Sequence, residues 1–193
     1  MKNFLNNYSY SAVKMFVNQF AISIFGAMLS MATTAVENNT ISVVASIASI
    51  IFYLFLIYTL AWEIGAKDRI SVDIGKKKKN IHIGLLVALL ANIPNMLIAI
   101  VYSIGYPFMG VQLWAGNMCT VVRVISILLQ GMYFGVTTSI TFGAQTLNFY
   151  PITYLLIMIP SLLTSWVAYA LGFKNKKFTS LFTYEEPDVS KRK

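Results

Sequence analysis

Residues 63–82, EIGAKDRISVDIGKKKKNIH, decide how this chain is arranged. The stretch holds six Lys or Arg against three acids, whereas residues 83–173 hold a single charged side chain. Apolar stretches flank it on both sides, each reaching the roughly 20 residues that a membrane-crossing helix needs. Because basic loops stay on the cytoplasmic side of a membrane, residues 63–82 predict a cytoplasmic loop that orients the rest of the chain.

The composition predicts an integral membrane protein. Of the 193 residues, 57% are hydrophobic and 11% are charged, which is too apolar for the surface of an ordinary soluble domain. The net charge of +8 is concentrated in the N-terminal arm, in the central loop and in the tail after Phe173. This distribution predicts contact with a lipid bilayer that carries anionic headgroups, and no binding of nucleic acid.

The apolar segments predict an all-α fold, a polytopic transmembrane helix bundle. Five spans are strong by hydropathy, and a sixth is weaker. The expected spans are residues 15–35, 41–62, 83–104, 111–130, 131–149 and 152–173, and the loop 63–82 and the tail 174–193 complete the chain.

The weak segment 131–149 carries small residues at four-residue intervals. Gly131, Gly135, Ser139 and Gly143 would fall on one face of a helix, where small side chains let membrane helices pack closely. A Gly/Thr-rich external loop is the alternative interpretation of this segment.

The charges of the tail bear on the number of spans. With residues 63–82 inside, five spans would leave the six Lys or Arg of the tail outside, against the positive-inside rule. A helix over 131–149 restores an even number of crossings between the third and last spans. We therefore predict six spans with both termini cytoplasmic. Five spans with the tail outside, and four spans plus a re-entrant Arg123 segment, are the alternatives.

Two features of the predicted spans could bind a solute. Arg123 is the one ionisable residue deep in a span, where a cation costs about 2.5 kcal/mol or more. Arg123 would contact an anion or a lipid headgroup, or balance a charge in a cavity. The alternative is that helix carbonyls or lipid phosphate accept its hydrogen bonds.

Asn92, Pro94 and Asn95 predict a broken helix, and broken helices line substrate sites in many carriers. A structural kink with local repair by the two amides is the alternative.

The sequence carries no signature of catalysis. The predicted spans hold no Asp or Glu, so a proton-coupled carboxylate relay is not expected. His82 stands alone at a membrane boundary, and Cys119 has neither a second cysteine nor a histidine nearby. We therefore expect no enzymatic activity, no cofactor and no metal site.

The basic run Lys76, Lys77, Lys78 and Lys79 is interpreted as solvated charge that faces lipid headgroups. A docking surface for a cytoplasmic partner is the alternative. A high ratio of Lys to Arg, with abundant Ile and Asn, is typical of an AT-rich bacterial genome, which places the protein in a bacterial cytoplasmic membrane.

Three stretches resemble those of small uncharacterised multi-pass membrane proteins of Gram-positive bacteria, a likeness that implies no known activity: residues 15–20, 62–68 and 91–95. In size, span count and basic cytoplasmic faces the chain also resembles the substrate-binding membrane subunits of energy-coupling factor vitamin transporters. The Ala-xxx-Ala docking pattern of those subunits is absent from the first span, where Gly26, Ser30 and Thr34 take its place.

These features favour a non-enzymatic membrane protein of transport type, either a small permease or the membrane subunit of a larger transporter. An accessory or scaffold protein is the alternative, in which small-residue helix faces dock a partner membrane protein or a second copy of the chain. A polar cavity that reaches Arg123 would favour the first hypothesis.

Overall fold

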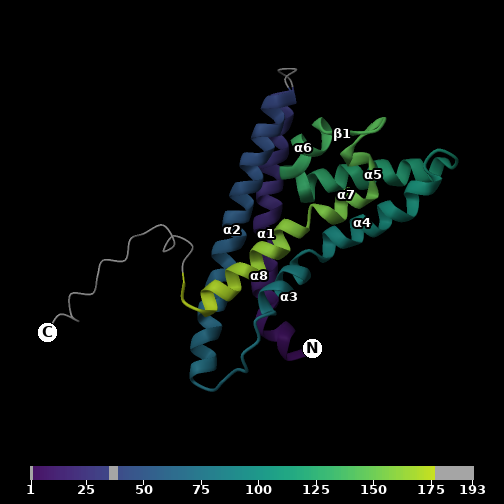
Figure 1. Ribbon diagram of the computed structural model, residues 1–193. Coiled ribbons are helices and arrows are strands. Elements are labelled where there is room, and N and C mark those ends of the chain that lie inside the picture. The colour runs from purple at the N-terminus through teal and green to yellow at the C-terminus, as the bar shows by residue number, and fades with distance from the viewer. Residues whose placement is uncertain (1, 35–38, 177–193) are drawn as a thin grey trace.

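Two long helices and an oblique layer of shorter helices make up the fold (Figure 1). The computed structural model describes residues 2–34 and 39–176, so most of the predicted tail lies outside the described residues. The helices are α1 (Lys2–Thr34), α2 (Asn39–Asp73), α3 (Ile83–Ala91), α4 (Ile93–Gly105), α5 (Leu113–Gln130), α6 (Phe134–Ser139), α7 (Pro151–Leu156) and α8 (Ile159–Phe173).

Within the described residues, four helical segments are long and apolar enough to cross a membrane, and a fifth qualifies if a bent pair counts as one span. The four are Phe4–Thr33, Asn39–Asp73, Leu113–Ser139 and Pro151–Phe173, and the pair is Ile83–Ala91 with Ile93–Phe108, which bends by 57°. The predicted all-α, multi-helix architecture is therefore confirmed, with four to five candidate spans.

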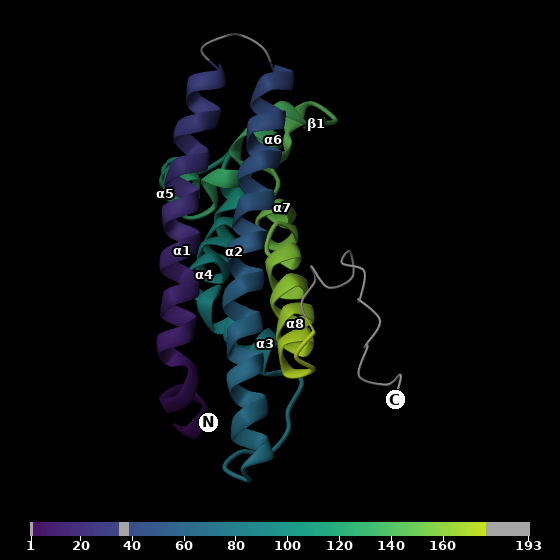
Figure 2. The ribbon, with the colours of Figure 1, turned by 90° about the vertical axis from the view of Figure 1, so that its left-hand side faces the viewer.

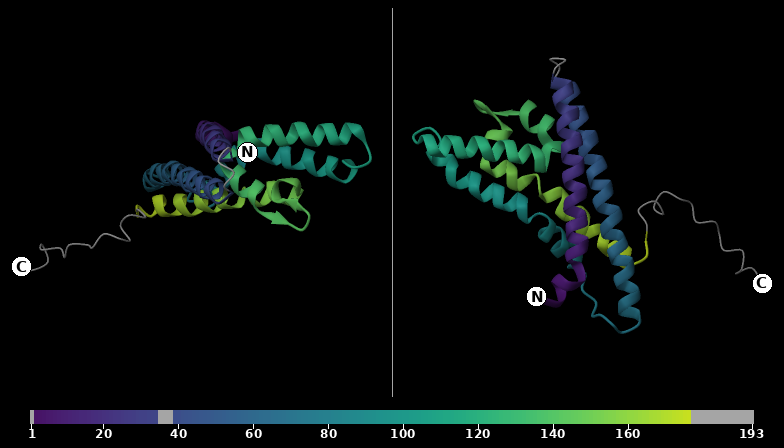
Figure 3. Two further views of the ribbon diagram at one scale, coloured as in Figure 1. Left: turned by 90° about the horizontal axis from the view of Figure 1, so that it is seen from above. Right: turned by 180° about the vertical axis from the view of Figure 1, so that it is seen from behind.

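Helices α1 and α2 run side by side as an antiparallel hairpin, and α8 lies along α2 (Figure 2). The other helices extend to one side of this hairpin, where α4 packs against α5 and α7 (Figure 3). Ser42, Ser46 and Ser49 lie buried on the inner face of α2, and Tyr53, Ile57 and Ala61 continue that face. The hairpin is therefore the frame on which the rest of the chain is assembled.

Helix α2 is longer than the sequence predicted. It continues for 11 residues past Trp62, to Asp73, through the first half of the predicted loop. Side chains four apart pair along this extension, Glu63 with Lys67 at 2.6 Å and Arg69 with Asp73 at 3.7 Å, and such pairs support a helix. The helix is ended by Gly75, whose φ is +74°. The N–H of Lys76 donates to the carbonyl of Ser71, and the N–H of Gly75 donates to the carbonyl of Val72. This is a Schellman motif, in which glycine takes the left-handed position.

The prediction of one continuous helix over residues 131–149 is wrong. The segment forms a 3-10 turn, η2 (Gly131–Tyr133), then the short helix α6, a hairpin of β1 (Thr141–Phe142) with β2 (Gln145–Thr146), and a second 3-10 turn. Gly143 has φ +65° and begins the two-residue hairpin turn, a conformation that a helix cannot contain. The segment therefore supplies no sixth helix of spanning length.

The small residues of this segment are separated by the break. Gly131 is buried against Ser23 of α1, and Gly135 is buried against Ser42 of α2, whereas Ser139 ends α6 and Gly143 lies in the exposed hairpin turn. The two buried glycines thus pack inside the chain, where they bring η2 and α6 onto the hairpin.

We expect Gly65→Ala to lower the thermal stability of the detergent-solubilised protein by about 1–3 kcal/mol. A β-carbon at Gly65 would collide with the backbone of Tyr169 and Phe173, at the closest approach of α2 and α8. Gly116→Ala is the matched control, because that helical glycine meets nothing closer than a carbonyl oxygen at 3.5 Å. The control should be neutral or stabilising, as alanine is the better helix former. Equal effects of the two substitutions would contradict the proposed close approach.

Candidate functional site

A small cavity of mixed polarity reaches Arg123, the residue that the sequence singled out. We call it the Arg123 pocket; its volume is about 40 Å³. It lies between α5, the η2–α6 turn and the stretch leading into α7, and none of the described residues that line it is acidic. Its polar lining residues include Arg123, Gln130, Tyr133, Asn148, Thr153 and Tyr154.

The main feature of this pocket is its set of unpartnered polar groups. Within the described part of the chain, Nε of Arg123, both amide atoms of Gln130 and the hydroxyl of Tyr133 are buried without a hydrogen-bond partner. Gln130 is 5% exposed and Tyr133 is 7% exposed. A buried polar atom without a partner costs about 1–3 kcal/mol. All four atoms belong to residues that line this cavity, which favours a polar occupant.

The Arg123 guanidinium makes few close contacts with the described residues. It lies 4.5 Å from the centre of the Phe149 ring, and its closest described hydrogen-bond partner is the hydroxyl of Thr120 at 3.5 Å. A cation over an aromatic face is stabilised without losing its donors. The pocket therefore presents a positive charge and three kinds of donor, the chemistry that binds a small anionic group.

The broken helix that was predicted at Asn92 lies elsewhere. Asn92 separates α3 from α4, and Pro94 stands in the first turn of α4. The Asn92 amide donates to the Ala88 carbonyl at 2.9 Å, and the Asn95 amide donates to the Asn92 side-chain oxygen at 2.9 Å. These bonds repair the helix locally, although Oδ1 of Asn95 is buried without a partner among the described residues.

The structure does not bring Asn92, Pro94 and Asn95 into the Arg123 pocket. Pro94 instead lines a separate groove of about 340 Å³ between α1 and the α3–α4 junction, which is almost wholly apolar. His82 stacks beside Trp166, and Cys119 is fully buried, so neither faces a polar cavity.

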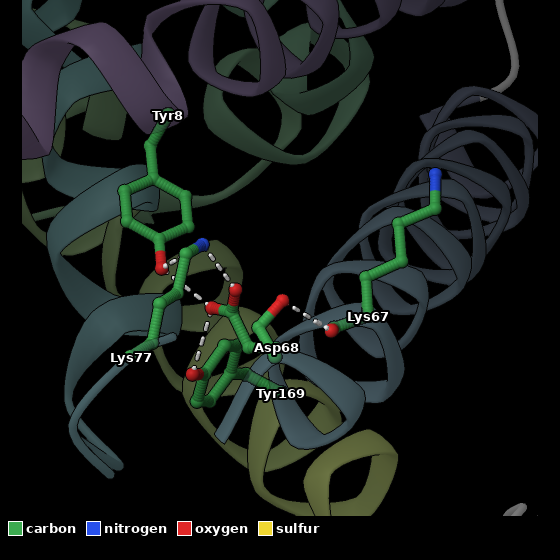
Figure 4. Close-up of polar contacts among 6 residues, drawn as sticks. Tyr8, Lys67, Asp68, Lys77 and Tyr169 are labelled. Atoms are coloured by element: carbon green, nitrogen blue, oxygen red, sulfur yellow. Dashed lines mark hydrogen bonds and ion pairs between the residues drawn. The ribbon is translucent and has the colours of Figure 1, made fainter. Parts of the chain in front are cut away.

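A second polar site was missed by the sequence reasoning. We call it the Asp68 cluster, formed by Tyr8, Asp68, Lys77 and Tyr169 (Figure 4). Oδ2 of Asp68 accepts hydrogen bonds from the hydroxyls of Tyr8 at 2.6 Å and Tyr169 at 3.0 Å. Oδ1 accepts one from Nζ of Lys77 at 2.6 Å, and Nζ also donates to the Tyr8 oxygen at 3.1 Å. The carboxylate, 4% exposed, is thus fully paired.

The signal for Asp68 was present in the periodicity of α2. Buried residues follow one another at Tyr53, Ile57, Ala61 and Gly65, and Asp68 is the next position on that face. Treating residues 63–82 as a loop ended the pattern too early. Helix α2 therefore carries a buried carboxylate, Asp68, in the part that extends beyond the predicted span 41–62.

The four lysines of the basic run are not equivalent. Lys76 and Lys78 are exposed, and Lys79 lies 5.7 Å from the centre of the Phe173 ring, whereas Lys77 is engaged by Asp68. Desolvation lowers the pKa of Lys77, but the hydrogen bonds to Asp68 and Tyr8 and the charge of Asp68 outweigh it, so its pKa lies above the ordinary value. Lys77 therefore carries its charge at neutral pH.

Comparison with known proteins identifies no relative. No family model, no curated protein and no solved structure matches the chain. Of the resemblances drawn from the sequence, these comparisons and the structure support only a multi-helix protein with four to five candidate membrane spans.

Among residues 2–34 and 39–176, no group of three His, Cys, Asp or Glu side chains could hold a metal ion.

We expect Gln130→Leu to raise the thermal stability of the protein purified without added solute. The substitution removes two unpaired buried amide atoms at similar volume, and removing such atoms is neutral or stabilising by about 1–3 kcal/mol. Ser46→Ala is the contrasting control, because the buried Ser46 hydroxyl donates to the Met132 carbonyl at 2.5 Å. It should lower stability. Thermal unfolding in one detergent measures both, and a destabilised Gln130→Leu would show that the amide is already satisfied.

Proposed function

We propose that the protein is a non-enzymatic, multi-pass protein of a bacterial cytoplasmic membrane, of transport type, which binds a small anionic group in the Arg123 pocket. It would act as a small permease or as the membrane subunit of a larger transporter. The observation that carries this proposal is that Arg123, Gln130 and Tyr133, which line one cavity, each have a buried polar atom without a partner among the described residues. Proteins keep such costly groups in apolar surroundings where they have a function.

The size of the pocket limits what it can hold. One water needs about 10–15 Å³ of such volume, so about 40 Å³ admits a group of three or four heavy atoms. A carboxylate matches this volume, and its oxygens would accept from Arg123, Gln130 and Tyr133. The absence of an acidic side chain among the described lining residues supports an anion over a cation.

The packing supports an even number of crossings. The start of α3 packs on the second half of α8, where Gly84 lies against Tyr169. The same end of the molecule holds the Asp68 cluster, which joins the first turns of α1 to the end of α2. Helix α5 instead ends against the middle of α1, near Gln19 and Ser23 (Figure 1). We therefore favour four crossings with a re-entrant Arg123 segment over six.

The accessory alternative has lost its main support. It relied on small-residue faces that would be free to dock a partner, but Gly131 and Gly135 are buried against α1 and α2. Gly65 and Gly172 are likewise used between α2 and α8. A partner would have to bind another surface.

We expect acetate and formate to stabilise the wild-type protein in detergent, and Arg123→Gln to abolish the effect. At about 100 times its dissociation constant an anion would add about 2.7 kcal/mol to stability. Arg69→Gln is the matched control: it removes the same charge from an exposed pair on α2, and its response should equal that of the wild type. A stabilisation by anion retained in Arg123→Gln, or no stabilisation of the wild type by either anion, would refute the site.

Transport assays in proteoliposomes then distinguish a permease from a transporter subunit. A permease would carry the bound anion across the membrane, whereas an isolated subunit would only bind it.

We expect cysteines introduced at Lys78 and Asn175 to react with an impermeant maleimide from one side of the membrane, and a cysteine at Phe142 to react from the other. All three positions are exposed, and the hairpin that holds Phe142 lies at the far end of the α1–α2 frame from Lys78. The native Cys119 is fully buried and gives a low background. Labelling of Lys78→Cys and Asn175→Cys from opposite sides would exclude an even number of crossings.

A further inference from the structure

We propose that Tyr8, Asp68 and Tyr169 form a binding site for a primary ammonium group, and that Lys77 occupies this site as a ligand tethered to the same chain. The site is distinct from the Arg123 pocket and does not depend on the proposed anion. Its external ligand would be a small free amine or the ethanolamine headgroup of a lipid, which present the same R–NH₃⁺ group.

The fixed part of the site comes from three helices. Tyr8 lies on α1, Asp68 on α2 and Tyr169 on α8, separated by 60 and 101 residues along the chain. All three side chains are buried, and the two hydroxyls hold the carboxylate through Oδ2. Oδ1 is left to face the ammonium. The two bonds that hold Oδ2 do not involve Lys77.

Lys77, the side chain that occupies the site, lies on a turn and not on a helix. Lys77 belongs to the turn after α2 that the Schellman motif at Gly75 redirects, and its side chain is 30% exposed. Its backbone N–H bonds the carbonyl of Ser71, which brings the side chain back over Asp68. A lysine on a turn can leave the site without unfolding a helix, whereas the three helical residues cannot.

The geometry selects a primary ammonium. Nζ donates to Oδ1 of Asp68 at 2.6 Å and to the Tyr8 oxygen at 3.1 Å, and it lies 4.6 Å from the centre of the Tyr8 ring. A primary ammonium has three N–H donors in a tetrahedral arrangement, so it can make both bonds and still point one donor to water. A quaternary ammonium keeps the attraction to the ring but has no N–H to donate.

An adjoining cavity provides room for a second amine. Its volume is about 190 Å³, and Tyr8, Asp68 and Lys77 form part of its wall. The exposed residues Tyr10, Lys14, Glu63 and Lys67 complete its outer side. Both carboxylates of this cavity are paired with a lysine at 2.6 Å, Glu63 with Lys67 and Asp68 with Lys77. A cation in the cavity would therefore reach Asp68 only when Lys77 leaves it.

Tethering has a measurable consequence. A tethered ligand competes at an effective concentration of millimolar order, so an external amine would bind the wild-type protein weakly. Removing the Lys77 side chain would leave a buried carboxylate without its cation, which destabilises the protein and opens the site. The variant should therefore bind an amine more tightly than the wild type does.

The test compares Lys77→Ala with the wild type in detergent, by thermal unfolding with and without millimolar ethylammonium. We expect Lys77→Ala to unfold about 5–10 °C below the wild type, and ethylammonium to restore most of that loss. Tetramethylammonium at the same concentration should restore none, and the wild type should respond to neither salt. Lys67→Ala is the matched control, since it removes a lysine from an exposed pair, and it should show neither the loss nor the rescue.

The double variant Asp68→Asn with Lys77→Ala removes the anion as well as the tether, and ethylammonium should not stabilise it. Equal rescue of the double variant, or no rescue of Lys77→Ala, would overturn the proposal. If Lys77→Ala fails to fold alone, its purification in ethylammonium decides: folded protein there but not in tetramethylammonium supports the site, and folded protein in neither overturns it.

Nanodiscs distinguish the two sources of the ammonium. Lys77→Ala stabilised in phosphatidylethanolamine discs but not in phosphatidylcholine discs would assign a lipid headgroup. Equal stability in the two lipids, with rescue by free ethylammonium, would assign a soluble amine. Equal stability with no rescue by ethylammonium would refute the site.

Discussion

The buried carboxylate of Asp68 is the constraint on which the rest of the structure depends. Removing a carboxylate from water is expensive, and the cost is offset only where every lone pair finds a donor. Tyr8, Lys77 and Tyr169 supply those donors from α1, from the turn after α2 and from α8. Each helix must therefore reach the cluster at a fixed height. The bonds set the register of the α1–α2 hairpin and the depth at which α8 packs on α2, where Gly65 and Gly172 already bring the backbones together.

The two polar sites differ in whether their polar groups find partners within the chain. In the Asp68 cluster every oxygen of the carboxylate is paired, and the positive partner belongs to the chain. In the Arg123 pocket the charge and its neighbours Gln130 and Tyr133 keep atoms that no described residue satisfies. A paired network holds elements together, whereas an unpaired one lowers stability until something polar enters. The unpaired groups of the Arg123 pocket thus lie beside the middle of α1, whereas the paired Asp68 cluster lies near the start of α1 and the end of α2.

The sequence predicted the features that depend on local chemistry. The α1–α2 hairpin follows from two apolar stretches with a short polar connection, and the break at Asn92 follows from Pro94 with two amides beside it. Prediction failed where residues far apart in the sequence determine the environment of a side chain. Asp68 looks like a loop charge until Tyr8 and Tyr169, 60 and 101 residues away, are placed around it. Arg123 was recognised because a cation in an apolar helix is conspicuous by itself, but Gln130 and Tyr133, which line the same pocket, were not.

The break after α5 explains why the small-residue series was misleading. A helix that stops at Gln130 exposes its last carbonyls, and in apolar surroundings they must be satisfied. Polar side chains of α1 and α2 satisfy these backbone groups. Gln19 donates to the carbonyl of Leu129, and Ser23 donates to the carbonyl of Ile127. Ser23 also accepts from the N–H of Gly131, and Ser46 donates to the carbonyl of Met132. The same glycine spacing that permits a continuous helix also permits the close approach that these bonds require. Local spacing was compatible with both outcomes, and the polar side chains of α1 and α2 selected the broken one.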